Sequence, residues 1–172
     1  MAISIWGKRM EEFPQIVIIL KEKRSAEQTL ALYQRFGGST EIYYDAYKPA
    51  LDELRRHPRC YVPGYKCDSS EVIAMSHLTV SRAFNSPAVE ALSARKRAIY
   101  FDACGHWRGC IYDNIPGFVV HDYEELRVQV QKLLYDTTDA EYNPFLETHI
   151  RNTIDTYLDG RAIAHFRQLP SE

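Results

Sequence analysis

Short apolar runs alternate with amphipathic stretches along the chain. Residues 15–20 form a continuous, largely β-branched run, which is typical of a strand buried on both faces of a parallel sheet. Shorter strands are predicted at residues 60–62, 78–81, 98–101 and 118–120. Between these runs, apolar residues recur at helical spacing. Strand and helix therefore alternate with short links, which predicts an α/β fold with a parallel sheet.

Helix boundaries are marked by capping residues, glycine and proline. Three residue pairs have the spacing of a capping box, namely Ser25 with Gln28, Asp68 with Glu71, and Asp122 with Glu125. Ser86 places a capping hydroxyl directly before Pro87 at the first helical position, which is a favoured helix start. The expected helices cover residues 3–13, 25–36, 45–57, 68–75, 86–95, 122–134 and 145–158. No repeat or linker-like stretch interrupts this order, which predicts a single domain over residues 1–172.

Charge and hydropathy exclude several classes of protein. The chain has 172 residues, and its 21 basic and 23 acidic residues leave a formal net charge of −2. A general nucleic-acid-binding domain usually carries a basic excess, so we expect no nucleic-acid partner. The longest strongly apolar run, Ile16–Leu20, is far shorter than the roughly 20 residues that span a bilayer. The N-terminus lacks the pattern of a secretion signal, so we expect a cytoplasmic protein without a transmembrane segment.

The cysteines indicate neither a disulfide scaffold nor a metal site. None of the four forms a Cys-x-x-Cys pair, and reduced thiols are expected in the cytoplasm. Cys104, His106 and Cys110 are metal-ligand types close together, but their spacing differs from that of common structural zinc sites. We therefore predict that the chain holds no metal.

Candidate chemistry is expected just after the strands, because open parallel sheets bind ligands outside the carboxyl ends of their strands. The residues in these positions are Lys21, Lys23 and Arg24, then Asn85, Ser86 and Pro87, then Asp102 and His106. Cations near a helix N-terminus suit a phosphate, because backbone amides and the helix dipole favour negative charge there. Glu90, one turn into the helix at 86–95, is placed to accept hydrogen bonds from ribose hydroxyls.

Each of these features also has an ordinary structural explanation. A basic cluster at a strand end is most often a solvated edge, Ser86-Pro87 is explained as a helix start, and Glu90 suits the dipole of the first turn. The glycine fingerprints of Rossmann dehydrogenases and P-loop NTPases are absent. The remaining histidines, at positions 57, 77, 121, 149 and 165, are scattered without partners and are expected at the surface or in the core.

The stretch from Ser76 to Asp102 resembles the donor-binding half of GT-B glycosyltransferases. In that family a strand and a small-residue turn lead into a helix with Glu-Ala-Leu, and a Gly-Lys-Pro-like turn leads into the next strand. Here Ser86-Pro-Ala-Val-Glu-Ala-Leu92 matches the helix, and Arg95-Lys-Arg97 replaces the turn. The segment 113–120, followed by Asp122-Tyr-Glu-Glu-Leu, resembles the segment before the penultimate helix of that family. The tail Leu158-Asp-Gly-Arg-Ala162 is similar to the ends of bacterial capsule and surface-polysaccharide transferases.

The resemblance implies a fold, a substrate and a set of site residues. The fold would be a Rossmann-like three-layer domain with a mostly parallel sheet of five or six strands and flanking helices. The substrate would be a nucleotide sugar, used without a further cofactor in surface polysaccharide biosynthesis. The implied nucleotide- and phosphate-binding residues are Lys21, Lys23, Arg24, Asn85, Ser86, Pro87, Ala88 and Glu90, with Asp102 and His106 on the donor-sugar side.

Two departures from the GT-B pattern bear on activity. GT-B enzymes have two Rossmann-like halves, whereas this chain has room for only the donor-binding half, either as a fragment or as one subunit of a split enzyme. The resemblance therefore implies an N-terminal acceptor-binding domain or subunit as partner, with peripheral membrane association through that partner. The paired-acid pattern Glu-x7-Glu is incomplete, because Arg82 stands where the first acid would be. No catalytic residue is assigned, because the base of the family usually comes from the missing half.

Two other functions stay open on the sequence. The first is a non-catalytic α/β binding or scaffold module with a degenerate nucleotide pocket. The second is a small doubly wound enzyme that acts alone on a phosphorylated metabolite, with His106 as its base.

Overall fold

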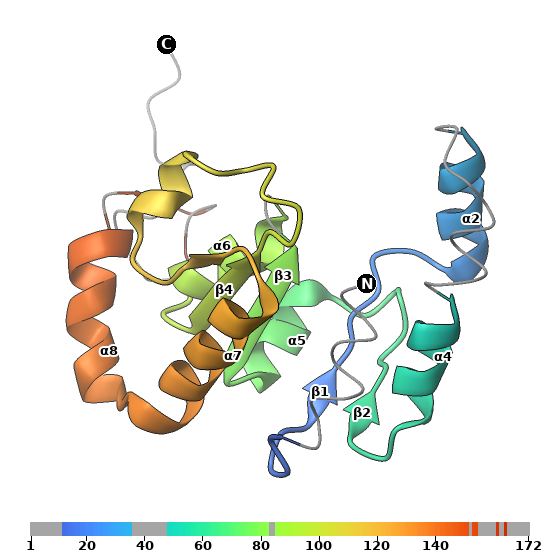
Figure 1. The fold of residues 1–172 in the computed structure, drawn as a ribbon, viewed down its shortest axis with the longest axis horizontal. Coiled ribbons are helices and arrows are strands. Elements are labelled where there is room, and N and C mark those ends of the chain that lie inside the picture. Colours follow the sequence, from blue (N-terminus) through green and yellow to red (C-terminus); the bar gives the residue numbers. More distant parts are fainter. Residues whose placement is uncertain are drawn as a thin grey trace. The chain divides into compact units, whose positions relative to one another are not determined.

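The chain forms two compact units, Met1–Val72 and Ile73–Glu172. The computed structural model (Figure 1) describes residues 12–35, 48–82, 85–151, 153–154, 161 and 164. The helix predicted at 3–13 and the later part of the one predicted at 145–158 therefore fall mostly outside the described residues.

The first unit contains a small parallel sheet and two described helices. Its elements are β1 (Ile18–Ile19), α2 (Ala26–Arg35), α4 (Lys48–Arg56) and β2 (Cys60–Tyr61). The two strands run parallel, with Ile18 opposite Cys60 and Ile19 opposite Tyr61. Leu51 and Leu54 of α4 are buried and supply the apolar face of that helix. Helix α5 (Ser69–Met75) follows at the boundary between the units.

The strand expected at residues 15–20 is shorter and less buried than the sequence predicts. Only Ile18 and Ile19 are assigned to β1, both are half-buried, and the side chain of Val17 is 64% exposed. The expectation of burial on both faces was wrong at this strand. The reason is that β1 belongs to a sheet of two strands, which does not provide the layers that bury a central strand of a larger sheet.

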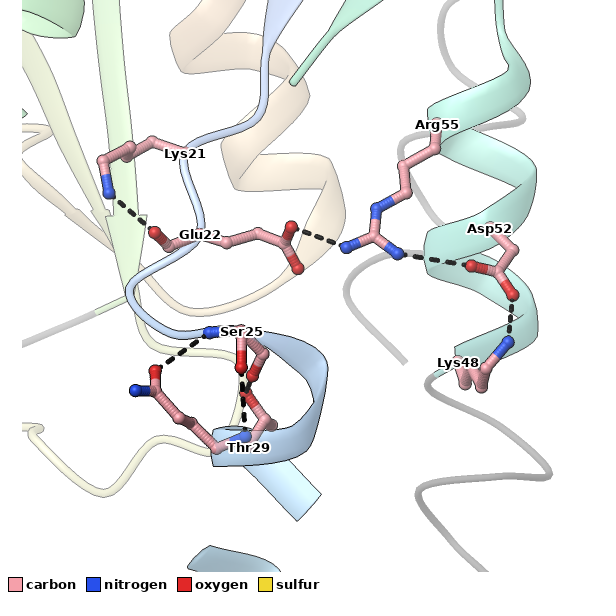
Figure 2. Close-up of polar contacts among 8 residues, drawn as sticks. Lys21, Glu22, Ser25, Thr29, Lys48, Asp52 and Arg55 are labelled. Carbon is pink, nitrogen blue, oxygen red and sulfur yellow. Dashed lines mark hydrogen bonds and ion pairs between the residues drawn. The ribbon is translucent and has the colours of Figure 1, made fainter. Parts of the chain in front are cut away.

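An ion-pair chain connects the segment after β1 to α4 (Figure 2). Arg55 donates to Oε2 of Glu22 at 2.6 Å and to Oδ1 of Asp52 at 3.4 Å, and Lys48 contacts Oδ2 of Asp52 at 2.5 Å. The hydrogen bond to Glu22 is the main cause that raises the pKa of the Arg55 guanidinium, and burial opposes it. Glu22 lies in the segment predicted to be a solvated basic edge, so part of that segment serves the fold.

The predicted capping box at the start of α2 is confirmed. The backbone amide of Gln28 donates to Oγ of Ser25 at 3.3 Å, and the backbone amide of Ser25 donates to Oε1 of Gln28 at 3.1 Å. Thr29 adds a hydroxyl bond to the Ser25 carbonyl at 2.9 Å (Figure 2). Two backbone donors at the helix start are thus satisfied locally.

The second unit is built on a three-stranded parallel sheet with the order β3-β4-β5. The strands are β3 (Leu78–Arg82), β4 (Arg97–Phe101) and β5 (Val119–Val120). The helices are α6 (Ser86–Ser93), the 3-10 turn η2 (Ile111–Asn114), α7 (Tyr123–Gln131) and α8 (Asp139–Phe145). Helices α7 and α8 continue into π-helical turns at Lys132–Asp136 and Leu146–Ile150.

Strand β4 is the centre of this unit. Its last four residues, 98–101, are all buried, and it pairs with β3 on one side and β5 on the other. Helix α6 adds Ala88, Ala91 and Leu92 to the same core, with exposed fractions of 1% or less. Figure 1 shows β3 and β4 side by side in the unit that also carries α6, α7 and α8. Burial on both faces, expected for residues 15–20, is found here instead.

The parallel α/β class is therefore correct, but the described strands do not form the single sheet of five or six strands that was expected. The described strands make two separate sheets, one of two strands and one of three. Strand pairing depends on contacts between distant residues, which the hydrophobic pattern of each run does not specify.

The last helix begins earlier than predicted. Helix α8 starts at Asp139, where Thr138 and Glu141 form a complete capping box, instead of at residue 145. Pro144 lies inside this helix, although a proline at that depth usually ends or bends one. The prediction placed the start after Pro144, whereas the Thr-x-x-Glu spacing was the better indicator.

Arg95 occupies a backbone conformation that favours glycine. Its φ is 59°, and it follows α6 at the position where Schellman motifs place a left-handed residue. The amide of Lys96 donates to the Ala91 carbonyl at 2.8 Å and that of Arg95 to the Leu92 carbonyl at 2.9 Å, which is the hydrogen-bond pair of that motif. The side chain of Arg95 contacts Glu147 at 2.9 Å. Arg95 thus adopts the glycine-like turn at the point where the GT-B resemblance expects Gly-Lys-Pro.

Replacing Arg95 with glycine and with alanine separates the backbone from the side chain. Both variants lose the contact with Glu147, but only glycine adopts a positive φ without strain. We expect Arg95→Gly to be more stable than Arg95→Ala by about 1 kcal/mol in the free energy of unfolding, measured by urea denaturation. Ala94→Gly is the control, because Ala94 has a φ of −85° and glycine therefore relieves no backbone strain there. Equal stability of the two Arg95 variants would contradict the left-handed backbone conformation of residue 95.

Candidate functional site

The carboxyl ends of β3, β4 and β5 meet at one edge of the three-stranded sheet, because all three strands run parallel. Arg82 ends β3 with an exposed side chain, Asp102 follows β4, and His121 follows β5. The amide of Asp102 donates to the Val120 carbonyl at 2.8 Å, which holds the ends of β4 and β5 together. We call this set of strand ends and the connection 102–114 the carboxyl edge.

Asp102 is a buried carboxylate held by backbone amides. It is 5% exposed, and its Oδ2 accepts a hydrogen bond from the amide of Trp107 at 2.9 Å. Burial acts to raise the pKa of Asp102, but the amide bonds from Trp107 and His106 and the nearby His121 outweigh it, so the pKa is lowered. The carboxylate is therefore ionised, and it folds the chain after β4 back into a tight turn.

His121 lies between two carboxylates. Its Nδ1 is 3.4 Å from Oδ2 of Asp102, and its Nε2 is 3.6 Å from Oδ1 of Asp113. Asp113 accepts the backbone amide of Gly109 through its other oxygen, and the backbone amide of His121 donates to Oε2 of Glu125 at 2.7 Å. The carboxyl edge thus contains an Asp102–His121–Asp113 cluster, which links the ends of β4 and β5 to η2.

The start of α6 is anchored to β4 by a tyrosine. The hydroxyl of Tyr100 donates to the Asn85 carbonyl at 2.6 Å. Burial, with smaller effects from Tyr112, Cys110 and Glu90, raises the pKa of Tyr100 to about 12, so its hydroxyl keeps the proton that it donates. The N-cap residue is Asn85, not Ser86 as predicted, and its side chain makes no capping bond. Ser86 is instead the first helical residue.

The predicted residues of α6 differ in what they expose. Ala88 is fully buried in the core, so only its backbone is available to a ligand. Pro87 is half-buried, whereas Asn85, Ser86 and Glu90 are exposed. His106 is also exposed, in contrast to Asp102 on the same predicted sugar side.

The predicted cations Lys21, Lys23 and Arg24 lie in the first unit, apart in sequence from the carboxyl edge of the second. Nζ of Lys21 donates to the carbonyl of Glu22 at 2.6 Å (Figure 2). It also donates to the carbonyl of Tyr65 at 3.0 Å. Lys23 and Arg24 have exposed side chains. The predicted phosphate site therefore takes its cations from one unit and its helix start from the other, and a single site made of both stays a prediction.

A cavity of about 350 Å³ in the second unit is lined by none of the predicted site residues. Its apolar wall contains Phe118, Leu133, Tyr142 and Phe145, from the segment before β5, the π turn after α7, and α8. Ala98, the second residue of β4, also lines it, so the cavity lies toward the amino ends of the strands. It is distinct from the carboxyl edge.

Comparison with protein-family models identifies the chain. Residues 7–130 match the model described as polysaccharide biosynthesis PFTS motif protein. The chain belongs to this family. A role in polysaccharide biosynthesis follows from that membership. Comparison with curated proteins and with solved structures gave no match.

The matched region of this PFTS motif family member contains every residue of the predicted site and the whole Asp102–His121–Asp113 cluster. The family description supports the predicted link to polysaccharide biosynthesis, while glycosyltransferase activity is left to the proposal below. No helix among the described residues is long and apolar enough to cross a membrane. Within the same residues, no three His, Cys, Asp or Glu side chains are grouped to hold a metal ion.

His121 and Asp113 were not predicted as site residues. His121 was expected to be a scattered histidine without a partner, although it directly follows the strand predicted at 118–120 and so met the rule used for Asp102. Asp113 had no such indicator, because it lies in a turn whose approach to His121 depends on the folding of the whole connection 102–114.

Removing the charge of Asp102 should destabilise the PFTS motif protein in a pH-dependent way. Because the pKa of Asp102 is lowered in the folded state, its contribution is present above the ordinary value of 3.8 and is lost as the pH falls through the folded-state pKa. We expect Asp102→Asn to reduce the free energy of unfolding by about 1–3 kcal/mol at neutral pH. The difference from the wild type should shrink below about pH 4.

Urea denaturation of both proteins at steps from neutral to acidic pH measures this difference. Asp136→Asn, which changes an exposed acid after α7, is the matched control and should have little effect at any pH. If Asp102→Asn lowers the free energy of unfolding by the same amount at every pH, the side chain stabilises the fold by packing and not by its charge.

Proposed function

We propose that this chain is the nucleotide-sugar-binding part of a GT-B-type glycosyltransferase in surface polysaccharide biosynthesis. The observation that carries the proposal is the β3–α6–β4 arrangement. It brings the N-terminus of α6 and the end of β4 to the carboxyl edge of a parallel sheet, where such folds bind nucleotides. Family membership supports a role in polysaccharide biosynthesis, and the position of this edge in the fold supports a nucleotide as the ligand.

The exposed start of α6 suits the phosphates of a donor. The backbone amides of its first turn and its dipole favour an anion, and Asn85 and Ser86 are exposed there. Glu90 is exposed one turn further on, which suits a carboxylate that accepts hydrogen bonds from ribose hydroxyls. Asp102 and His106 are proposed for the sugar side of the same edge.

The family description supplies a second argument for this segment. Read in one-letter code, PFTS has phenylalanine and serine two positions apart, and Phe84-Asn-Ser86 is the one place in this chain with that spacing. This segment lies inside the matched region, and Ser86 is the first residue of α6. We infer that residues 83–86 are the local form of the motif, with alanine and asparagine at its other two positions.

The proposed mechanism is activation of the leaving nucleotide. As the bond between sugar and phosphate breaks, negative charge grows on the departing phosphate, and the backbone amides at the start of α6 would stabilise it. The acceptor and the catalytic base would come from a second domain or subunit. The same proposal locates the chain in the cytoplasm and has it associate peripherally with the membrane through that partner.

A second candidate is a non-catalytic binding or scaffold module with the same fold. The contacts of Lys21 favour it, because its ammonium already binds the carbonyls of Glu22 and Tyr65 and is used by the fold of the first unit. In this alternative the carboxyl edge would have no donor to hold.

Calorimetric titration of the full chain with UDP, GDP, CMP and CDP tests the proposal. We expect selective binding of one of them, weakened by added salt because the phosphates are held by charge. Glu90→Ala should bind that nucleotide about tenfold more weakly, since a hydrogen bond to a charged group is lost. Glu124→Ala, an exposed acid in the first turn of α7, should bind it as the wild type does.

Each outcome of this titration is decisive for one assignment. Full nucleotide affinity in Glu90→Ala would remove the ribose role of Glu90. If the folded wild type binds none of the four nucleotides, the scaffold module is favoured over the donor-binding domain.

A further inference from the structure

The cavity of about 350 Å³ in the second unit has the size of a small ligand site. Its volume lies near the lower end of the range of about 300–1,000 Å³ that is usual for ligand pockets. The turn that joins α7 to α8, drawn in orange in Figure 1, supplies Lys132, Leu133 and Asp136 to its lining. This turn is π-helical, a conformation that occurs frequently at functional sites. The volume and the turn together indicate a site for a small ligand.

Part of the lining is aromatic. Phe118, Tyr142 and Phe145 line the cavity, and the rings of Tyr142 and Phe145 stack with their centroids 5.3 Å apart. The guanidinium of Arg97 lies 5.5 Å from the centroid of the Tyr142 ring and donates to the Thr137 carbonyl at 2.8 Å, so it connects this ring to the turn before α8. Because the faces of aromatic rings attract C–H groups, this part of the lining suits the apolar face of a ligand.

Another part of the lining is polar, and two of its side chains have no partner among the described residues. These are Gln129, which is half-buried, and Lys132, which is exposed. The amide of Gln129 lies against Gly117, where an added Cβ would come within 2.6 Å of its Nε2. Asp136 accepts the side-chain amide of Gln131 at 3.3 Å through Oδ1. The cavity therefore offers hydrogen-bonding groups that the described part of the fold does not use.

The combination of aromatic rings and free polar groups distinguishes between classes of ligand. A pyranose has C–H groups on its faces and hydroxyls around its edge, so it would satisfy both parts of the lining. A wholly apolar ligand would bury the amide of Gln129 without a hydrogen bond, which is costly. A phosphorylated ligand would place its negative charge near Asp136 and Glu141, which would repel it. The lining thus favours an uncharged sugar over a lipid or a nucleotide.

We propose that this cavity binds a neutral pyranose unit of the polysaccharide in whose biosynthesis the family takes part. The C–H face of the sugar packs against Tyr142 and Phe145, and Gln129 and Lys132 bind its hydroxyls. Because Ala98 places the cavity toward the amino ends of the strands, a sugar bound here leaves the carboxyl edge open. The inference therefore does not depend on nucleotide binding at that edge.

NMR titration of the unmodified full chain with the methyl glycosides of glucose, galactose and N-acetylglucosamine tests this site. With at least one glycoside, we expect saturable shifts of the backbone amide of Gly117 and of the side-chain amide of Gln129, which lie together in the lining. The inference is overturned if none of the glycosides shifts these resonances. It is also overturned if the shifts are confined to the carboxyl edge, for example to the amides of Asp102 and His106.

Substitutions in the polar part of the lining test the contacts with the sugar. Gln129→Ala and Lys132→Ala should each bind the responding glycoside about three- to tenfold more weakly, because a hydrogen bond to a sugar hydroxyl is lost. Arg127→Ala and Val128→Ala change positions of α7 that do not line the cavity, and they should bind it as the wild type does. Wild-type affinity in both Gln129→Ala and Lys132→Ala would refute the choice of a sugar.

Two further kinds of ligand separate the alternatives. Cyclohexanol has a ring of similar size but a single hydroxyl, so the inference is wrong if cyclohexanol shifts the Gly117 and Gln129 resonances and no glycoside does. The nucleotides named above test the carboxyl edge independently. If a glycoside binds in the cavity and no nucleotide binds, the sugar site stands and the donor site does not. If a nucleotide binds and no glycoside does, the donor site stands and the sugar site is refuted.

Discussion

The carboxylate of Asp102 sits at the end of the most buried strand, and the connection 102–114 depends on its being satisfied. A charge that is 5% exposed must find donors within the protein, because leaving it unpaired costs several kcal/mol. The donors are the amides of residues 106 and 107, so the chain has to turn back immediately after β4. His121 completes this environment from the neighbouring strand.

The position of Asp102 follows in turn from the burial of β4. Strands on both sides and the small buried residues of α6 make β4 the one strand of its sheet whose last four residues are all buried. Because β3 and β5 run parallel to it, the start of α6 and the residues after β4 and β5 are brought to the same edge. The apolar core thus determines where the polar groups of the candidate site gather.

The sequence predicted local structure better than long-range pairing. All five described strands coincide with short apolar runs, and the capping residues Ser25 and Asp122 cap their helices as expected. These features depend on residues within one helical turn or one strand. The number of strands in each sheet depends on which runs meet, and the sequence pattern of residues 15–20 does not distinguish a strand with one neighbour from one with two. Asp113 was missed for the same reason, because its contact with His121 depends on the folding of the whole connection 102–114.

Burial also changes what each predicted site residue can contribute. The carboxylate of Asp102 is occupied by amides and by His121, so it would act on a bound sugar through the connection that it holds in place. His106 is exposed in that connection and is the sugar-side residue whose side chain reaches solvent. Ala88 offers a ligand only its backbone, whereas Glu90 offers an exposed carboxylate. A donor site at this edge would therefore combine direct contacts from α6 with a polar connection that is anchored to Asp102, which His121 in turn contacts.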